Sequence, residues 1–187
     1  MGDRQRSEPA TPAIDVLVEA GTWPSRARLK RITGRAITAA TARARAKIVP
    51  DSEVSIVFSD DAAIAVLNGR YRRKRKPTNV LSFPGTPEGA RRFGPLLGDI
   101  VLAEETVRRE AEEGGLRFED HLTHLLVHGF LHLLGHDHMK DDEASVMEGL
   151  ETKILADLGI ADPYADPPAA PVPRARGTQK GRKATTQ

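Results

Sequence analysis

The 187-residue chain contains no cysteine, few aromatic residues and no long uninterrupted apolar segment. Without cysteine there is no disulfide framework, no cysteine-based zinc finger and no thiol nucleophile. With aromatic residues at 4%, the hydrophobic core has to be mainly aliphatic. The longest apolar stretch, residues 125–134, is interrupted by two histidines and is shorter than the roughly 18 residues of a membrane span. The N-terminus also lacks the apolar region of a secretory signal, so we expect a cytoplasmic protein that does not bind membranes.

The two ends of the chain differ in composition from the rest. Residues 1–12 are polar and contain two prolines, whereas residues 163–187 combine several prolines with five basic residues. Such segments bury too little apolar surface to offset the entropy lost on ordering. We therefore predict disordered tails at 1–12 and 163–187 and one folded domain at 13–162. The basic tail is either simply solvated or an auxiliary contact for phosphate groups.

Between the tails, short β-branched runs alternate with segments of helical periodicity. Strands are expected at residues 14–19, 54–58, 79–83 and 99–102, and helices at 25–47, 60–71, 103–113, 118–134 and 141–158. This order predicts an α/β (α+β) fold in which about five helices pack around one small, mixed four-stranded sheet.

All six histidines lie within 18 residues of the chain. Four of them have helical spacing and share one face of a helix: His121, His124, His128 and His132. His128 and His132 lie one turn apart, and Gly135 allows the helix to end so that His138 returns to the same point. Three nitrogen ligands with one open position are typical of a catalytic zinc site. We predict one zinc ion at the end of this long helix, although nickel or copper would accept the same ligands.

The spacing of these ligands is also that of the metzincin proteases. Those enzymes carry a Glu directly after the first His as their general base, and here that position is Gly129. The pattern therefore predicts the metal site without the peptidase chemistry, and a metallopeptidase remains only a third hypothesis.

A second cluster is strongly basic. Six of the seven residues 70–76 are Arg or Lys, whereas six acidic residues are gathered between 141 and 157. A run of charge is often only a solvated surface, but this separation beside a predicted metal site is typical of a polyanion-binding protein. Because aromatic residues are few, we expect recognition of strand state and backbone shape rather than base stacking. The candidate phosphate contacts are Arg70, Arg73, Lys74 and Lys76.

Together these motifs resemble the YbeY family of bacterial endoribonucleases. The resemblance lies in residues 67–84, 97–101, the histidine motif, 141–144 and 147–151, and it covers about residues 14–164. It implies a zinc-dependent, single-strand-specific endoribonuclease that processes ribosomal RNA, notably the 3′ end of the small subunit, and takes part in ribosome quality control. The implied partners are single-stranded ribosomal RNA and ribosomal or small-subunit proteins, and we expect no DNA partner.

Carried over by position, the resemblance implies that His128, His132 and His138 are the metal ligands. It also implies that Arg72 is the catalytic arginine that faces the substrate phosphate. A planar guanidinium suits the stabilisation of charge on phosphoryl oxygens better than an ammonium group. Whether a metal-activated water or the ribose 2′-hydroxyl attacks phosphorus stays open at this point.

Two positions depart from the family pattern. Arg75 stands where we expect Asp, and this makes the segment more basic. His136 stands where Tyr is common, which leaves open a fourth ligand, a proton donor or a surface substitution. Asp137, like His136, is a candidate for orienting a ligand histidine by a hydrogen bond, without binding the metal itself.

A non-catalytic protein is the main alternative. In this hypothesis the chain is an RNA-binding ribosome assembly factor whose metal braces the fold. Replacement of His132 would then damage stability and RNA binding together. An enzyme would instead lose cleavage and largely keep RNA binding.

Overall fold

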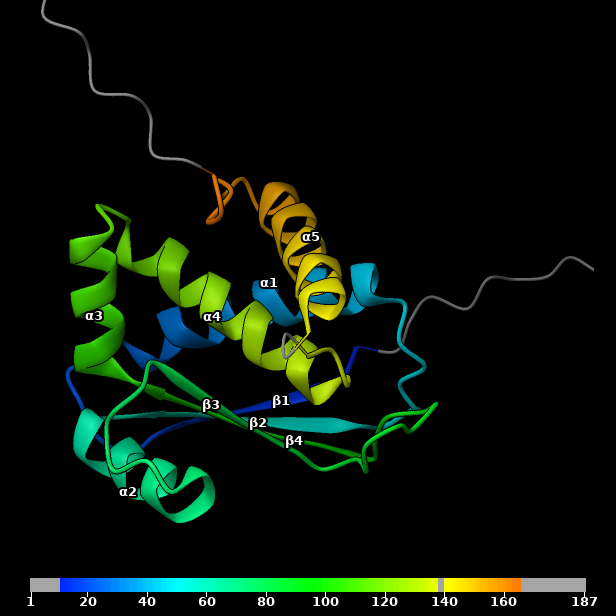
Figure 1. The fold of residues 1–187 in the computed structure, drawn as a ribbon, viewed down its shortest axis with the longest axis horizontal. Helices are drawn as coiled ribbons and strands as arrows, with labels where there is room; N and C mark the ends of the chain where they lie inside the picture. Colours follow the sequence, from blue (N-terminus) through cyan, green and yellow to red (C-terminus); the bar gives the residue numbers. More distant parts are fainter. Residues whose placement is uncertain (1–10, 138–139, 166–187) are drawn as a thin grey trace, which may run out of the picture.

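The fold is built on one four-stranded sheet. The computed structural model describes residues 11–137 and 140–165. In it, β1 (Ala13–Val18), β2 (Glu53–Ser59), β4 (Leu96–Ala103) and β3 (Val80–Pro84) are neighbours in that order (Figure 1). The pairs β1–β2 and β2–β4 are parallel, and β3 is antiparallel to β4. The predicted small mixed sheet is confirmed.

Five helices accompany this sheet in the described residues, as the sequence predicts. They are α1 (Arg26–Ala44), α2 (Asp61–Arg72), α3 (Glu104–Glu113), α4 (Phe118–Leu133) and α5 (Asp141–Asp157). Asp60 caps α2, because its side chain accepts a hydrogen bond from the main-chain nitrogen of Ala63 at 2.8 Å. None of the described helices is both long and apolar enough to cross a membrane.

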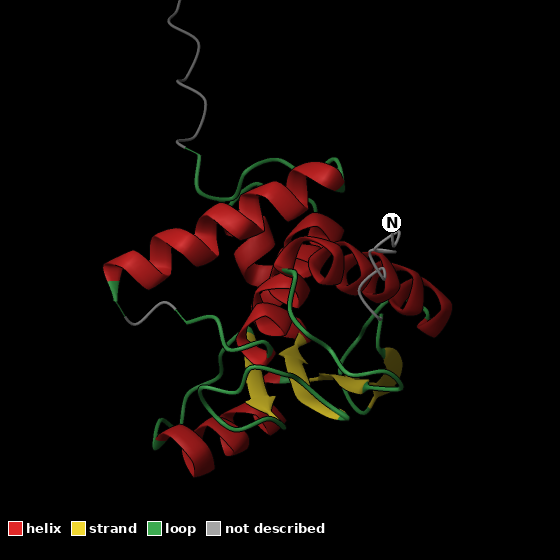
Figure 2. Ribbon diagram, turned by 90° about the vertical axis from the view of Figure 1, so that its right-hand side faces the viewer, coloured by secondary structure: helices red, strands yellow, loops and turns green. Residues whose placement is uncertain are grey.

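Helices cover both faces of the sheet. Figures 1 and 2 show α2 on one side and the other helices on the opposite side, where α4 lies over the sheet. In β4, Ile100 and Leu102 belong to the large core beneath α1, α4 and α5, whereas Val101 and Ala103 pack in the smaller cluster beneath α2. A sheet covered on both faces explains why its strands have almost continuous apolar sequences.

Two element boundaries differ by three residues from those predicted, whereas the others agree to within one residue. α1 ends at Ala44 rather than at residue 47, because Arg45 adopts a left-handed conformation with φ 50°. The chain beyond it pairs with the β3–β4 loop, through hydrogen bonds from Phe93 N to Lys47 O (3.0 Å) and from Val49 N to Phe93 O (2.9 Å). β4 begins at Leu96 rather than at residue 99, because it pairs with β2 from Glu53 onward.

Glycines decide how α4 is placed. A Cβ atom on Gly129 would lie 3.0 Å from both Ile100 Cγ2 and Ser82 Oγ, so the absence of a side chain lets the helix approach the sheet. The Ser82 hydroxyl donates a hydrogen bond to the Gly129 carbonyl at 3.1 Å. Gly135, with φ 79°, then ends α4 as the sequence predicts. Because position 129 faces the sheet, it offers no place for the general base of a metalloprotease.

Candidate active site

The histidine row lies along one face of α4. Neighbouring ring centroids from His121 through His124 and His128 to His132 are separated by 6.3, 6.3 and 4.6 Å. The rings meet edge to face, and the row approaches the end of the helix that Gly135 terminates. The structure therefore arranges four of the six histidines as the helical spacing predicts.

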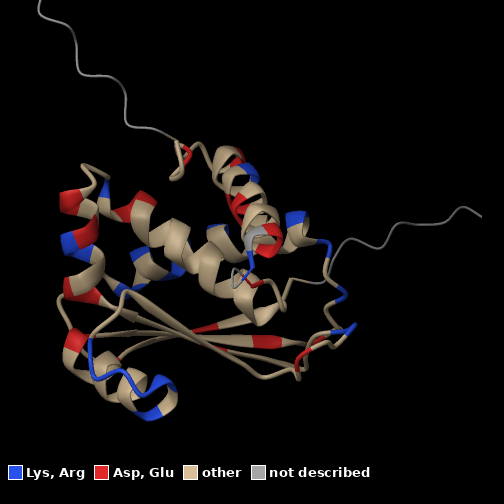
Figure 3. Ribbon diagram, in the orientation of Figure 1, with Lys and Arg blue, Asp and Glu red and all other residues tan. Residues whose placement is uncertain are grey.

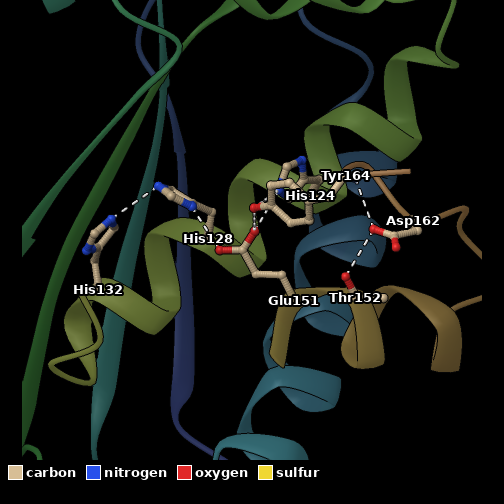
Figure 4. Close-up of polar contacts among 7 residues, drawn as sticks. All are labelled: His124, His128, His132, Glu151, Thr152, Asp162 and Tyr164. Carbon is tan, nitrogen blue, oxygen red and sulfur yellow. Dashed lines mark hydrogen bonds and ion pairs between the residues drawn. The ribbon is translucent and has the colours of Figure 1, made fainter. Parts of the chain in front are cut away.

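A fully buried carboxylate on α5, Glu151, holds this row from the side (Figure 4). It accepts hydrogen bonds from His124 Nε2 at 2.8 Å, from His128 Nδ1 at 2.9 Å and from the Tyr164 hydroxyl. Burial alone would raise the pKa of the carboxyl group, but hydrogen bonds from these three partners outweigh burial and hold the pKa at about 2. Glu151 is therefore ionised near neutral pH and can only accept hydrogen bonds.

Tyr164 reaches the site from the segment that follows α5. Asp162 fixes the turn, because its carboxylate accepts hydrogen bonds from Thr152 Oγ1 and from the main-chain nitrogen of Tyr164, both at 3.0 Å. Burial, together with the Glu151 carboxylate, raises the pKa of the Tyr164 hydroxyl, which stays protonated and donates. Tyr164 falls in the predicted tail 163–187, so the contacts of the folded domain extend beyond residue 162.

His128 and His132 face each other through their outer ring nitrogens. The two Nε2 atoms lie 3.1 Å apart, while His132 Nδ1 lies 3.0 Å from the main-chain oxygen of His136. Because the Nδ1 partner of each ring is an oxygen that only accepts, each neutral ring carries its proton on Nδ1. The Nε2 lone pairs then point toward one another. Two lone pairs at this distance repel unless they share a cation.

The donor set fits a metal ion. Zinc–imidazole bonds are about 2.0–2.1 Å long, so two ligands of one ion lie within about 4 Å of each other. The Nε2 separation of 3.1 Å meets this requirement. The third predicted ligand, His138, lies outside the described residues. Within 11–137 and 140–165, no set of three His, Cys, Asp or Glu side chains is arranged to bind a metal.

The two candidate orienting residues lie beside the ligand rings. His136 contributes its main-chain oxygen to His132, and burial lowers the pKa of its own imidazole. Asp137 is exposed on the same wall as His136. Among the described residues, the His136 main-chain oxygen lies within hydrogen-bond distance of His132 Nδ1, and Glu151 within that of His128 Nδ1.

A cavity of about 790 Å³ opens beside the two facing rings. Its walls come from the turn before β3, from β3, from the loop after β3 and from the end of α4. They include Arg72, Asn79, Ser82, Phe93, His128 and His132. Arg72 is exposed and is the last residue of α2. The structure thus brings Arg72 and two predicted metal ligands to one cavity, although they are distant in the sequence.

The other predicted phosphate contacts lie on the last turn of α2 and on the turn that follows it. All are exposed, and they form no ion pair with the described part of the chain: Arg70, Arg73, Lys74 and Lys76. Asn68 fixes the turn, because its main-chain oxygen accepts from Lys74 N at 3.3 Å and its amide donates to Lys76 O at 2.8 Å. A Cβ on Gly69 would lie 2.9 Å from Arg75 Cγ, so Arg75 packs closely over this glycine.

The opposite end of the histidine row has different partners. His121 Nε2 lies 2.9 Å from Glu110 Oε2, and the Asn79 amide donates to the same oxygen at 2.9 Å. His121 Nδ1 is buried and has no hydrogen-bond partner among the described residues. This arrangement connects α3, α4 and the start of β3, and it brings no second imidazole nitrogen to face the first.

Sequence reasoning missed Glu151 and Tyr164. Glu151 stands in the apolar stripe of α5 with Met147 and Ile154, and a carboxylate in that position needs buried donors. With six histidines upstream, this signal was available in the sequence. Tyr164 gives no comparable signal, because its role depends on the turn fixed by Asp162.

Comparison with known proteins identifies the family of the chain. The family model of the endoribonuclease YbeY matches residues 21–159. The Endoribonuclease YbeY of Rhizobium meliloti (strain 1021) is 53% identical over 161 residues, covering 83% of this chain and 96% of that protein. That of Allorhizobium ampelinum is 50% identical over 157 residues, covering 81% and 94%.

A solved structure has the same fold. The solution structure of a Thermotoga maritima protein covers 82% of this chain and 99% of its own, with a TM-score of 0.50 and 21% identity. This likeness supports the fold alone, whereas the family model and the close relatives decide membership. The chain belongs to the YbeY family of endoribonucleases.

Proposed function

We propose that the chain is a zinc-dependent endoribonuclease that hydrolyses phosphodiester bonds in single-stranded ribosomal RNA. The shared name of its close relatives supports cleavage of RNA. We place its action in the cytoplasm, at the 3′ end of small-subunit RNA and in ribosome quality control, with ribosomal proteins as partners. These finer assignments rest on the family resemblance.

The observation that carries the proposal is the pair of facing histidines on the cavity wall. His128 and His132 both have their Nδ1 atoms directed at oxygen acceptors, so both Nε2 atoms are prepared to bind one cation. Fixed Nδ1 partners orient ligand rings and raise their basicity. We assign His138 as the third ligand, since it follows the turn at Gly135. Three imidazoles leave a position for water or substrate.

A zinc ion bound by these residues supplies a Lewis acid beside the phosphoryl group and lowers the pKa of water. The protein supplies the remaining features. The ionised Glu151 keeps His128 in the tautomer that presents Nε2, and the His136 carbonyl does the same for His132. The cavity of about 790 Å³ admits a segment of single strand.

Arg72 is the basic side chain that lines the cavity together with the two rings, among the described residues. We assign it to the phosphoryl oxygens, where negative charge increases in the transition state. The exposed cations Arg70, Arg73, Lys74 and Lys76 bind neighbouring phosphates, and this gives affinity without sequence information.

The direct test is a cycle of metal removal and restoration. The protein is stripped with a chelator, reloaded with zinc and assayed on single-stranded ribosomal RNA. A His132→Ala variant purified in parallel excludes contaminating nuclease. We expect cleavage to disappear with the metal, to return with zinc and to be absent in the variant, whose RNA affinity stays close to that of the wild type.

Two outcomes would contradict the proposal. Equal cleavage by the wild type and His132→Ala would show that the activity comes from elsewhere. Loss of stability and RNA binding together in the variant, with no cleavage by either protein, would favour a metal-braced assembly factor. The product ends separate the two mechanisms, because a 5′-phosphate indicates attack by water and a cyclic phosphate indicates attack by the ribose 2′-hydroxyl.

A further inference from the structure

A second group of cations lies on two segments that pair at Phe93, a residue of the cavity wall. Four exposed residues form it, two from the segment after α1 and two from the β3–β4 loop: Arg45, Lys47, Arg91 and Arg92. The backbone pairs these segments, through Phe93 N to Lys47 O at 3.0 Å and Val49 N to Phe93 O at 2.9 Å. Figure 3 shows basic residues of both segments together at one end of the sheet.

The cavity connects this group to the first basic segment. Alternate residues of β3 line it, namely Val80, Ser82 and Pro84, so the cavity follows the strand. The residues before β3 include Arg72 at one end, and the loop after β3 contributes Phe93 at the other. At about 3.3 Å per residue, a five-residue strand separates the two ends by about 13 Å. The facing His128 and His132 lie on the wall between them.

The charge of this second group is not used by the fold. Arg43, on the last turn of α1, forms a two-point ion pair with Asp157 at 2.5 and 2.6 Å. The four cations Arg45, Lys47, Arg91 and Arg92 form no ion pair with the residues of 11–137 and 140–165. Two carboxylates line the cavity, Glu88 and Asp137, and Asp51 follows Lys47 on its segment; together they reduce the positive charge without cancelling it. Clustered cations that stabilise no partner in the fold attract a polyanion.

We propose that Arg45, Lys47, Arg91 and Arg92 form a second phosphate-binding surface for RNA. The strand runs from the basic segment 70–76 along β3, past the histidines, to this surface, so that both sides of the cleaved bond are held. The inference rests on the proposed function and extends it, because it specifies the path and the length of the strand that binds. An RNA too short to span the cavity does not reach both surfaces.

The test uses two double variants that each remove two adjacent cations. Arg91→Gln with Arg92→Gln changes the proposed surface. Lys30→Gln with Arg31→Gln is the matched control, since both residues are exposed on α1, beside the Arg28–Glu119 ion pair at the distant end of α4. RNA affinity is measured by fluorescence anisotropy with metal-stripped protein, for a dinucleotide, whose single phosphate reaches one surface only, and for a single strand of about 20 nucleotides.

We expect the Arg91/Arg92 variant to lose affinity for the longer RNA only. The slope of log K against log salt should fall in magnitude by about 1.4 for two lost contacts, and by about 2.8 when Arg45→Gln and Lys47→Gln are added. The control variant should change the slope much less. The proposal would be overturned if both double variants had the same salt slope. It would also be overturned if the Arg91/Arg92 variant lost equal affinity for both RNA lengths.

Failure of this inference is distinguishable from failure of the proposed function. Zinc-loaded Arg91/Arg92 variant should still cleave the short RNA at the wild-type rate, because these residues lie outside the reacting centre. If the wild type cleaves RNA but the salt slope of the Arg91/Arg92 variant is unchanged, the proposed phosphate-binding surface is wrong and the proposed endoribonuclease function is retained. If neither protein cleaves RNA but the salt slope changes as expected, the phosphate-binding surface is retained and the proposed endoribonuclease function is wrong.

Discussion

The two ends of the histidine row on α4 use the same residue type in different ways. At one end, His121 pairs with Glu110 and lies beside Asn79, which ties three elements together. At the other end, about 11–17 Å along the helix, His128 and His132 turn their Nε2 atoms toward each other. Only in the second arrangement do two nitrogen lone pairs face each other, so that a shared cation would remove their repulsion. Position on a helix face alone therefore does not make a histidine a candidate ligand. The hydrogen-bond partner of one ring nitrogen decides whether the other is available to a cation.

The largest effect is expected from substitutions at the end of the histidine row that contains His128 and His132. We expect His128→Ala to abolish zinc binding and RNA cleavage, with a loss beyond the roughly 10–100-fold that residues outside the ligand shell cost. The measurement is zinc affinity by chelator competition, together with the cleavage rate. Retention of zinc at wild-type affinity in this variant would remove His128 from the ligand set.

Arg72 tests whether the cavity at this end is the reaction site. Arg72→Lys keeps the charge but loses the planar fork, so we expect cleavage to fall on the order of 100-fold, with zinc affinity unchanged. Arg31→Lys is the matched control, because Arg31 is exposed on α1 outside the cavity wall, and it should change the rate little. Equal rates for both variants would exclude a special role for Arg72.

A substitution at Glu151 tests whether the hydrogen bond to His128 Nδ1 prepares that ring to bind zinc. In Glu151→Gln the neutral side chain no longer fixes His128 as a charged acceptor, and we expect zinc affinity to fall about 10–100-fold. Tyr164→Phe removes one donor and keeps the carboxylate, so its zinc affinity should stay near the wild-type value. Thermal unfolding of the metal-free proteins separates this effect from a general loss of stability. Unchanged zinc affinity in Glu151→Gln would leave the carboxylate a purely structural role.

The smallest effect is expected at the other end of the row. His121→Asn breaks the contact with Glu110 and should lower the free energy of unfolding by about 1 kcal/mol. Zinc affinity and cleavage of RNA should remain at wild-type levels. Denaturant unfolding measures the first quantity, and the metal and cleavage assays measure the others. A large loss of zinc affinity would show that the two ends act as one site.

Much of this site was predictable because it depends on local order in the chain. Helical spacing determines that His128 and His132 share a face, and Gly135 determines where that helix ends. Alternating and near-continuous apolar runs determine the number of strands. The basic character of residues 70–76 is likewise a property of the sequence alone.

The tertiary structure alone decided which distant groups meet. Glu151 reaches His124 and His128 because α5 packs beside α4, and Tyr164 joins them through the turn at Asp162. The cavity exists because β3 forms the edge of the sheet beside the end of α4. Local periodicity specifies which face of an element is buried, but it carries no information about which other element covers that face. The sequence therefore determines that His128 and His132 share a helix face. Only the packing of the helices determines which groups form hydrogen bonds with their rings.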